Sequence, residues 1–397
     1  MNFVFVSPHF PEHYWRFCAA LRENGIQVLG IADTPYEHLL PQLRDSLSDY
    51  YQVPSLEDGE AVLRAIGWFI SRHGRIDWIE SNNEYWLAQD AWLRTMFNVR
   101  TGPNLDRMDI YKHKSSMKAV YQQAGIPTAP SMLADTLENA LAFTRKHGYP
   151  LVAKPDVGVG ANDTFRLKDE RDLRDFFSRL PLQPYLLERY VVGEVCSYDA
   201  LIDAQGQPLY ETGNITPSNI MDVVNEKNES VYMIVPEIAP DLRDAGRRAV
   251  SAFGAFSRLI HFEFFRLTQD QAGLGRAGDL LGLEVNMRPS GGFTPDMINY
   301  AGSVDIHRLW ADMVRFDRIH LDQNRRKYFC VFVGRQDTHV YRYGHDELMR
   351  DWHHRIVHHA RIPEALSGAM GNAMYLAQCM NRDEVDAFVR YACERLP

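Results

Sequence analysis

The sequence has no long hydrophobic run, few cysteines and no excess of basic residues. No apolar segment approaches the length of about 20 residues that spans a bilayer, which argues against a membrane-spanning helix. The net charge of −9 argues against a nucleic-acid partner, because such a partner requires a basic face. The five cysteines form no Cys-x-x-Cys pair, and this odd, dispersed set predicts reduced thiols. Since the N-terminus also lacks the basic region of a signal peptide, we expect a cytoplasmic protein.

Two nucleotide-binding motifs are missing as well. The predicted first strand leads into Ser-Pro-His-Phe-Pro at residues 7–11 and not into a Gly-x-Gly-x-x-Gly loop. This disfavours a dinucleotide-dependent dehydrogenase. The glycine-containing segment at residues 158–163 does not match the Walker A pattern Gly-x-x-x-x-Gly-Lys-Ser/Thr, so it is not a P-loop.

The composition is that of a globular protein, with 45% hydrophobic and 24% charged residues in a chain of 397. A chain of this length is too long for one core, so two or three domains are expected. Up to about residue 103, short apolar segments alternate with amphipathic ones, which predicts a βαβ layer with a parallel sheet. The expected strands are Phe3–Val6, Gln27–Ile31 and Ile76–Glu80, and the expected helices are Glu12–Asn24, Leu56–His73 and Tyr85–Phe97.

Further elements follow along the chain. A helix is expected from Asn104 to Gln123, with a basic cluster at residues 112–114. From about residue 311 a smaller α/β segment is expected, with strands Tyr328–Val333, His339–Tyr343 and Met374–Met380 and helices Asp346–His353 and Asp383–Leu396. A group of four histidines, His353, His354, His358 and His359, lacks a zinc-binding spacing and is interpreted as a structural or surface feature.

The most informative segment is the strand that leads from residue 281 to residue 292. Alternation places Glu284, Asn286 and Arg288 on one face of this strand. Carboxylate and amide oxygens suit a hard cation such as magnesium. A guanidinium two residues further can hold a phosphate or a carboxylate in a fork. The alternative is a solvated polar face of an ordinary antiparallel strand.

A second acid favours the metal interpretation. Glu263 lies inside the strongly apolar segment Ile260–Leu267, where an unpaired carboxylate is costly. The residues 268–279 suit a long hairpin loop, and antiparallel pairing across it brings Glu263 beside Glu284. Two adjacent carboxylates repel each other unless a cation lies between them.

Three other segments carry candidate residues. Lys154 ends a strand and precedes a loop with Gly158 and Gly160, which suits phosphate binding, although a plain hairpin turn would look the same. Glu188 lies in the strand Tyr185–Tyr190, which breaks before Glu194, a pattern that suits adenine and ribose recognition or an ordinary hairpin. Glu84 follows the third predicted strand, where it complements the next helix or reaches a substrate amine.

In this order the features resemble the ATP-grasp superfamily of the carboxylate–amine ligase type, which includes biotin carboxylase and L-amino acid ligase-like proteins. The resemblance covers about residues 100 to 310, and its most specific part is Glu284-x-Asn286-x-Arg288. It implies an α/β ATP-grasp fold with an N-terminal βαβ pre-ATP-grasp domain and a small C-terminal α/β element. The implied boundaries are 1–103 for the first domain, 104–310 for the ATP-grasp domain with a lid at about 115–188, and 311–397 for the C-terminal subdomain.

The resemblance also implies roles for the candidate residues. Lys114 and Lys154 would contact ATP phosphates, and the loop from Gly158 to Asn162 would close over them. Arg288 would orient the carboxylate substrate, and Arg288 and Lys154 would be the catalytic residues. Glu188 and the backbone around Arg189 and Val191 would meet adenine, Glu194 the ribose, and Glu263, Glu284 and Asn286 one or two Mg²⁺ ions, with Mn²⁺ as an alternative. Asn162 stands where the family often has serine, which leaves the loop geometry open.

The implied activity is an ATP-dependent ligase that converts a carboxylate to an acyl-phosphate and couples it to an amine or amino acid. The expected partners are these small molecules, and a homodimer is common in the resembling family. Two alternatives stay open at this point. One is an enzyme that activates bicarbonate, such as a carboxylase or a carbamoyl-phosphate-synthase-like protein. The other is an ATP-binding regulatory protein without catalysis.

Overall fold

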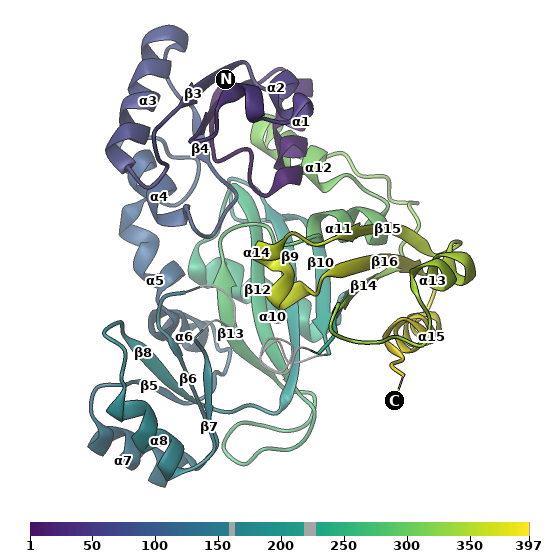
Figure 1. Cartoon of the computed structure of the whole chain (residues 1–397). Coiled ribbons are helices and arrows are strands. Elements are labelled where there is room, and N and C mark those ends of the chain that lie inside the picture. The colour runs from purple at the N-terminus through teal and green to yellow at the C-terminus, as the bar shows by residue number, and fades with distance from the viewer. Residues whose placement is uncertain (159–162, 218–227, 397) are drawn as a thin grey trace.

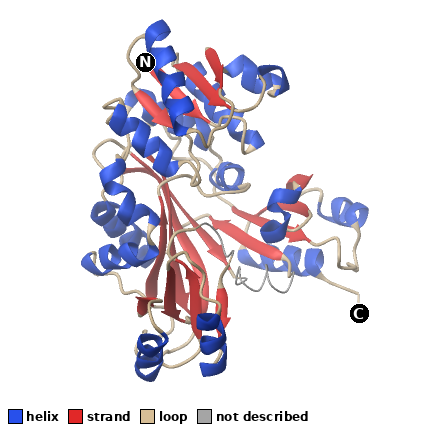
Figure 2. Ribbon diagram, turned by 60° about the vertical axis from the view of Figure 1, so that its left-hand side comes forward, coloured by secondary structure: helices blue, strands red, loops and turns tan. Residues whose placement is uncertain are grey.

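The computed structural model describes residues 1–158, 163–217 and 228–396, and it contains three β-sheets in this part of the chain. The first sheet is parallel and lies near the N-terminus, with helices on both sides of it (Figures 1 and 2). This is the βαβ layer that the alternation of strands and helices predicts. The strands are β1 (Asn2–Val6), β2 (Gln27–Ala32), β3 (Asp49–Gln52) and β4 (Trp78–Glu80), and the helices are α1 (Trp15–Glu23), α2 (Pro41–Ser46), α3 (Gly59–His73) and α4 (Leu87–Met96).

The order of this sheet, β3-β2-β1-β4, places a topological switch point beside β1. The chain leaves β1 toward β2 on one side, and β4 pairs with the opposite edge of β1. Ligands of open α/β sheets bind where the strand order reverses, at the carboxyl ends of the strands. The loop from Ser81 to Glu84 follows β4 at this end of the sheet.

The second sheet is antiparallel and has the order β13-β12-β9-β10-β11-β14-β16-β15 within the described residues. The strands after residue 311 extend this sheet, since β14 pairs with β11 (Figure 1). The domain boundaries at residues 103 and 310 remain predictions. The strands are β9 (Gly193–Ile202), β10 (Pro208–Thr216), β11 (Ser230–Val235), β12 (Arg258–Leu267), β13 (Leu280–Asn286), β14 (Phe329–Arg335), β15 (Ile356–Arg361) and β16 (Ala373–Cys379).

The third sheet forms a small layer with two helices, at the lower left of Figure 1. It is antiparallel and has the order β5-β8-β6-β7. Its core is small and apolar, with Leu151, Ala153 and Leu187 fully buried. The elements are β5 (Ser131–Leu133), α7 (Leu137–His147), β6 (Leu151–Pro155), β7 (Phe165–Leu167), α8 (Glu170–Ser178) and β8 (Tyr185–Arg189).

The second sheet has one apolar face and one face that is polar near β13. Phe262, Phe264 and Val285 lie on the apolar face and pack on α6 and α10. On the opposite face, apolar side chains such as Leu201 and Leu259 join a core that includes Phe3 of the first sheet and Trp310. The remaining helices are α5 (Met108–Lys112), α6 (Lys114–Gln123), α10 (Pro240–Phe253), α11 (Thr294–Gly302), α12 (Ile306–Phe316), α13 (His345–Trp352), α14 (Glu364–Met370) and α15 (Arg382–Cys393).

Two predicted elements are wrong. The single helix expected from Asn104 to Gln123 is interrupted at His113, which has extended backbone angles. The amide of Lys114 there donates to the carbonyl of Asp156, so α6 starts as a separate helix beside β6. The strand expected from His339 to Tyr343 is also absent, because this segment forms only one isolated bridge, between Tyr341 and Arg395.

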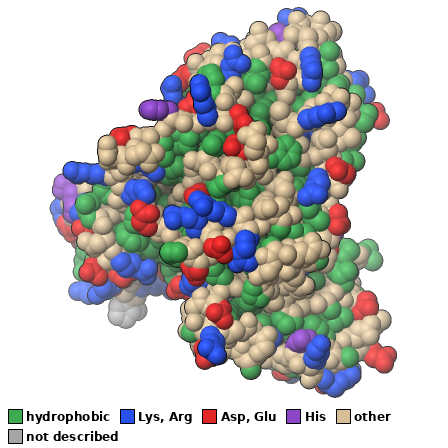
Figure 3. Space-filling model, turned by 180° about the vertical axis from the view of Figure 1, so that it is seen from behind, with side chains coloured by type: hydrophobic (Ala, Val, Ile, Leu, Met, Phe, Trp, Pro, Cys, Tyr) green, Lys and Arg blue, Asp and Glu red, His purple; other side chains and the backbone are tan. Residues whose placement is uncertain are grey.

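Basic and acidic side chains are interspersed over the face of the molecule that Figure 3 shows. This distribution agrees with the net charge of −9. None of the helices in the described part of the chain combines the length and the apolar character that crossing a bilayer requires.

Candidate active site

The centre of the candidate site is the antiparallel pair of β12 and β13. Glu263 lies directly opposite Glu284, so the predicted pairing of the two carboxylates is confirmed. A β-bulge follows, because Leu283 has no partner in the ladder. Gly282 at the bulge lies on the ring of Tyr121, where an added Cβ atom would come within 2.6 Å of the ring. The hydroxyl of Tyr121 donates to the carbonyl of Glu284 at 3.0 Å, which anchors the bulge from below.

The two paired acids differ in their electrostatic environment. Burial raises the pKa of the Glu284 carboxyl; Lys114 opposes this shift, and Glu263 adds to it. Burial acts in the same direction on Glu263, but His261, Arg288 and Lys114 outweigh it and lower the pKa of that carboxyl. The Lys114 ammonium lies 3.4 Å from Glu284 Oε1. The pair is therefore a partly buried concentration of negative charge that a cation would stabilise.

His261 belongs to this site, although the sequence analysis did not select it. Its Nδ1 lies 2.7 Å from Asp199 Oδ1, and its Nε2 lies 2.9 Å from Glu263 Oε1. Ionised carboxylates only accept hydrogen bonds, so both ring nitrogens must donate and the ring is an imidazolium. Burial lowers the pKa of His261, but the two carboxylates outweigh it and raise the pKa to about 10. The His-x-Glu spacing in β12 was the available signal, and the ring fixes the orientation of Glu263.

The donor set at β12 and β13 fits a hard divalent cation. Glu263 and Glu284 supply carboxylate oxygens, and Asn286, one row further along β13, supplies an amide oxygen. Among the described residues, no group of three or more His, Cys, Asp or Glu side chains is arranged to hold a metal ion by itself. Two acids and an amide are the donors expected for magnesium that also binds substrate phosphates, because magnesium is seldom held by a protein cage alone.

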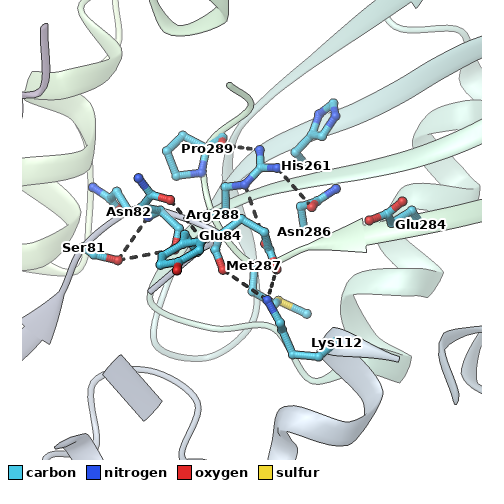
Figure 4. Close-up of polar contacts among 12 residues, drawn as sticks. Ser81, Asn82, Glu84, Lys112, His261, Glu284, Asn286, Met287, Arg288 and Pro289 are labelled. Carbon is cyan, nitrogen blue, oxygen red and sulfur yellow. Dashed lines mark hydrogen bonds and ion pairs between the residues drawn. The ribbon is translucent and has the colours of Figure 1, made fainter. Parts of the chain in front are cut away.

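Arg288 connects this strand to the N-terminal part of the chain (Figure 4). Its guanidinium donates to Asn286 Oδ1 at 3.1 Å and to the carbonyl of Pro289 at 2.8 Å. Its Nε lies 3.6 Å from Glu84 Oε2, and Lys112 Nζ lies 3.0 Å from Glu84 Oε1. The side chains of Glu84 and Arg288 are 11% and 17% exposed, so this pair of opposite charges is accessible to a small molecule at its edge only.

The structure shows which partners the Glu84 carboxylate has. Helix α4 begins at Leu87, and no side chain caps its N-terminus. The Glu84 carboxylate instead forms ion pairs with Lys112 and Arg288. The Glu84 side chain therefore does not cap α4 by a hydrogen bond, and contact with a substrate amine stays a prediction.

Three lysines gather where the small sheet faces α6. Lys154 at the end of β6 and Lys118 on α6 each place Nζ 3.0 Å from Glu188 Oε2. Burial raises the pKa of Glu188, but the two lysines outweigh it and lower that pKa. Lys114 donates to the carbonyl of Gly158 at 2.9 Å. Lys118 was not selected from the sequence, although it lies one helical turn after Lys114 and so on the same face of α6.

The remaining candidates surround these lysines or lie outside the described residues. Arg189 ends β8 and donates to the carbonyl of Ala272, while its own amide pairs with the carbonyl of Pro130. Val191 is buried, and Glu194 lies near the start of β9 opposite Arg266. Gly160 and Asn162, which were predicted to close over phosphates, lie outside the described residues.

Asp90, a buried acid next to the candidate site, has a raised pKa that can be tested by substitution. Asp90 is fully buried and accepts hydrogen bonds from the amide and hydroxyl of Ser81. Burial and the neighbouring Glu80 raise the pKa of Asp90 to about 8. An unfolded aspartate titrates near pH 4, so stability present in acid is lost as the pH rises toward the folded value. Asp90→Asn should therefore gain Tm relative to wild type between about pH 5.5 and about pH 8.5, and parallel Tm–pH curves would contradict this assignment.

Comparison with known proteins gives a local sequence match. Residues 113–183 match the family model of the ATP-binding domain of the carbamoyl-phosphate synthase L chain. A segment of 117 residues is 28% identical to an L-arginine-specific L-amino acid ligase of Bacillus subtilis, covering 30% of this chain and 28% of that protein. The chain thus matches about a quarter of the length of the curated relatives.

Solved structures match over nearly the whole chain. An L-amino acid ligase from Bacillus licheniformis superposes with a TM-score of 0.69 and 19% identity, covering 98% of this chain and 96% of that one. The biotin carboxylase domain of 2-oxoglutarate carboxylase from Hydrogenobacter thermophilus, solved with MgADP and bicarbonate, gives a TM-score of 0.69 and 17% identity, covering 95% and 86%. The predicted α/β ATP-grasp fold is confirmed.

Proposed function

We propose that this chain, which has the ATP-grasp fold, is an ATP-dependent ligase that activates a carboxylate as an acyl-phosphate and couples it to an amine or amino acid. The observation that carries the proposal is the pairing of Glu263 with Glu284, followed by Asn286 at the end of β13 and by Arg288 two residues beyond it. A cation site and a carboxylate-binding guanidinium stand side by side there, with the Lys114 ammonium 3.4 Å from Glu284.

The residues take separate roles in this proposal. Glu263, Glu284 and Asn286 would hold one or two Mg²⁺ ions, or Mn²⁺ in their place. When bound, the metal neutralises charge on the phosphate oxygens of ATP. Arg288 binds the carboxylate substrate and steadies the acyl-phosphate that it becomes. The ATP-binding residues are Lys114, Lys154, Gly158, Gly160 and Asn162 at the phosphates, Glu188, Arg189 and Val191 at adenine, and Glu194 at the ribose.

The proposed reaction has two displacement steps. A carboxylate oxygen of the acid attacks the γ-phosphorus of ATP, the bond to the bridging oxygen breaks, and ADP leaves. The amine nitrogen then attacks the acyl carbon, phosphate leaves with the bonding electron pair, and the nitrogen loses one proton. Phosphoryl transfer depends mainly on positioning and on neutralisation of charge. Lys154 and Arg288, as fixed cations, serve both purposes.

The pair of Arg288 and Glu84 favours an amino acid as one substrate. These two side chains present opposite charges 3.6 Å apart on separate segments of the chain. A zwitterionic amino acid would replace their mutual ion pair with two pairs, its carboxylate on Arg288 and its ammonium on Glu84. Lys112, which donates to Glu84 Oε1, would keep that carboxylate oriented.

Bicarbonate activation is the second candidate function. It is favoured by the match of residues 113–183 to a carbamoyl-phosphate-synthase domain. Bicarbonate is itself a carboxylate-like anion that a guanidinium can bind in a fork. It has no ammonium group, so it would leave Glu84 paired with Arg288 and Lys112 without a direct role.

An ADP-release screen tests these alternatives. Purified protein with ATP and Mg²⁺ is incubated with each amino acid, with other small acids and with bicarbonate, and products are identified by mass spectrometry. Release that depends on an organic acid, with an amide product of equal amount, is the expected result. Release with bicarbonate alone would replace the proposal by the second candidate. ATP binding without turnover across the whole panel would indicate a regulatory protein and overturn both.

The proposed setting is the cytoplasm, with small molecules as the partners. The five cysteines are free thiols in the structure, and four of them are buried. Reduced thiols are the usual state inside cells. A homodimer, which is common in the resembling family, is testable by light scattering of the purified chain.

A further inference from the structure

A cluster of buried charges lies between the first sheet and the end of β13, after which Arg288 follows. Glu80, Arg94 and Arg258 are 3%, 0% and 2% exposed. Glu80 Oε2 lies 2.9 Å from Arg258 Nη2 and 3.4 Å from Arg94 Nη1. The contact between Glu80 and Arg258 joins residues 178 positions apart. It therefore links β4 of the first sheet to β12 of the second sheet.

Arg258 has a second partner that bears on the candidate site. Its Nη1 donates to the carbonyl of Met287 at 2.5 Å. Met287 stands between Asn286, the last residue of β13, and Arg288. The ladder between β12 and β13 ends with Asn286, so the guanidinium holds the backbone where ladder hydrogen bonds stop.

Glu80, the second partner of this salt bridge, lies at the start of the loop that carries Glu84. Glu80 is the last residue of β4, and the loop from Ser81 to Glu84 follows directly. Ser81 is fixed in turn by Asp90, which accepts from its amide at 2.9 Å. One buried salt bridge thus joins the base of the Glu84 loop to the backbone that precedes Arg288.

We infer that Arg258 is a positioning residue, which acts through Glu80 and Met287 to set the spacing between Arg288 and Glu84 for the carboxylate substrate. This inference rests on the proposed function for its effect on substrate. The spacing is sensitive because a displacement of about 1 Å in a substrate-holding group can cost about a hundredfold in rate. The Arg258 side chain is tightly packed, since a Cβ atom added to Gly102 would lie only 2.6 Å from Arg258 Nη2.

Arg94 offers a matched control for this role. It is as buried as Arg258 and shares the partner Glu80. Its other hydrogen bonds go to the carbonyls of Ile79 at 2.7 Å and Pro103 at 2.8 Å, and none of those that the structure shows reaches β13. Removing either guanidinium disturbs a buried charge cluster, but only Arg258 ties that cluster to the strand of Arg288.

The experiment compares Arg258→Lys with Arg94→Lys. Both variants should lose Tm, because lysine cannot make the two separate hydrogen bonds of a guanidinium. Arg258→Lys should raise the KM for the acid about tenfold or more while the KM for ATP stays within about twofold. Arg94→Lys should leave both KM values near those of wild type. Hydrogen exchange should accelerate in the peptide covering residues 281–293 of Arg258→Lys and not of Arg94→Lys.

Two results would overturn the inference. One is equal behaviour of the two variants in KM and in the exchange of residues 281–293, which would make Arg258 a structural residue only. The other is an unchanged exchange rate there in Arg258→Lys. The exchange measurement needs no turnover, so it decides the inference even if wild-type protein fails every arm of the ADP-release screen and the proposed function falls.

Discussion

Glu284→Gln is expected to lower acid-dependent ADP release by about a thousandfold, because the site loses one of the two carboxylates that would hold the metal ion against the phosphates. The fold should survive. Burial already raises the pKa of the Glu284 carboxyl, with Glu263 adding to the shift, so a neutral amide of the same shape relieves repulsion in the free protein. The measurement is steady-state ADP release at saturating ATP and acid, together with Tm.

Glu263→Gln should have a similar effect on turnover, but a different one on stability. Glu263 accepts from the His261 imidazolium at 2.9 Å, and an amide in its place leaves that charge with one carboxylate partner. We therefore expect a lower Tm for Glu263→Gln than for Glu284→Gln. Glu211→Gln is a suitable control, since Glu211 lies on β10 in an ion pair with Arg247, away from the acids of β13. Near-wild-type turnover in both Glu263→Gln and Glu284→Gln would remove the metal assignment.

Arg288→Lys is expected to reduce kcat/KM for the acid by about a hundredfold. An ammonium keeps the charge but cannot bind a carboxylate in a fork, and it cannot also hold Asn286 and the carbonyl of Pro289. Nucleotide affinity should change little, because the three lysines that face Glu188 and Glu284 remain. Kinetics with varied acid at fixed ATP, and nucleotide titration without acid, measure the two effects.

The control for this substitution is Arg266→Lys. Arg266 lies on the neighbouring strand β12, and its guanidinium pairs with Asp241 at 2.6 Å near the surface. Among the described residues its side chain contacts neither Glu263, Glu284 nor Arg288, although it lies opposite Glu194 of the proposed ribose site, so its replacement should leave the KM for the acid unchanged. If Arg288→Lys raised the KM for ATP and the KM for the acid by the same factor, Arg288 would belong to the nucleotide site.

Much of the fold follows from local patterns. The alternation of apolar and polar residues located β1, β2 and β4 and the helices α1, α3 and α4 to within a few residues, whereas β3 and α2 were not predicted. The break at His113 escaped this reasoning, because it depends on a backbone hydrogen bond from Lys114 to Asp156 in a different segment. The missing strand at residues 339–343 has a similar origin, since its apolar and aromatic residues satisfy the pattern without a partner strand to pair with.

The candidate site likewise combines residues that local sequence patterns predict with contacts that those patterns do not predict. Glu263 and Glu284 were found because a hairpin brings neighbouring segments together, and a period of two decides which side chains share a face. Lys118 and Glu188 lie 70 positions apart in sequence, and Asp199 and His261 lie 62 positions apart. No local period links residues at such distances, so their contacts could not be predicted.

The sequence by itself determined the spacing of Glu284, Asn286 and Arg288, its likeness to the ATP-grasp family, and the acid that pairs with Glu284. Each of these depends on local spacing, which the geometry of one strand or one hairpin converts directly into position. Arg288, which was predicted on the same strand, lies two residues beyond the end of β13. Only the tertiary structure decided that His261 is held between two carboxylates and that Glu84 meets Arg288. It also decided that Arg258 joins β12 to the first sheet. Those contacts arise from the packing of separate sheets against one another, where long-range burial determines which charges must find partners.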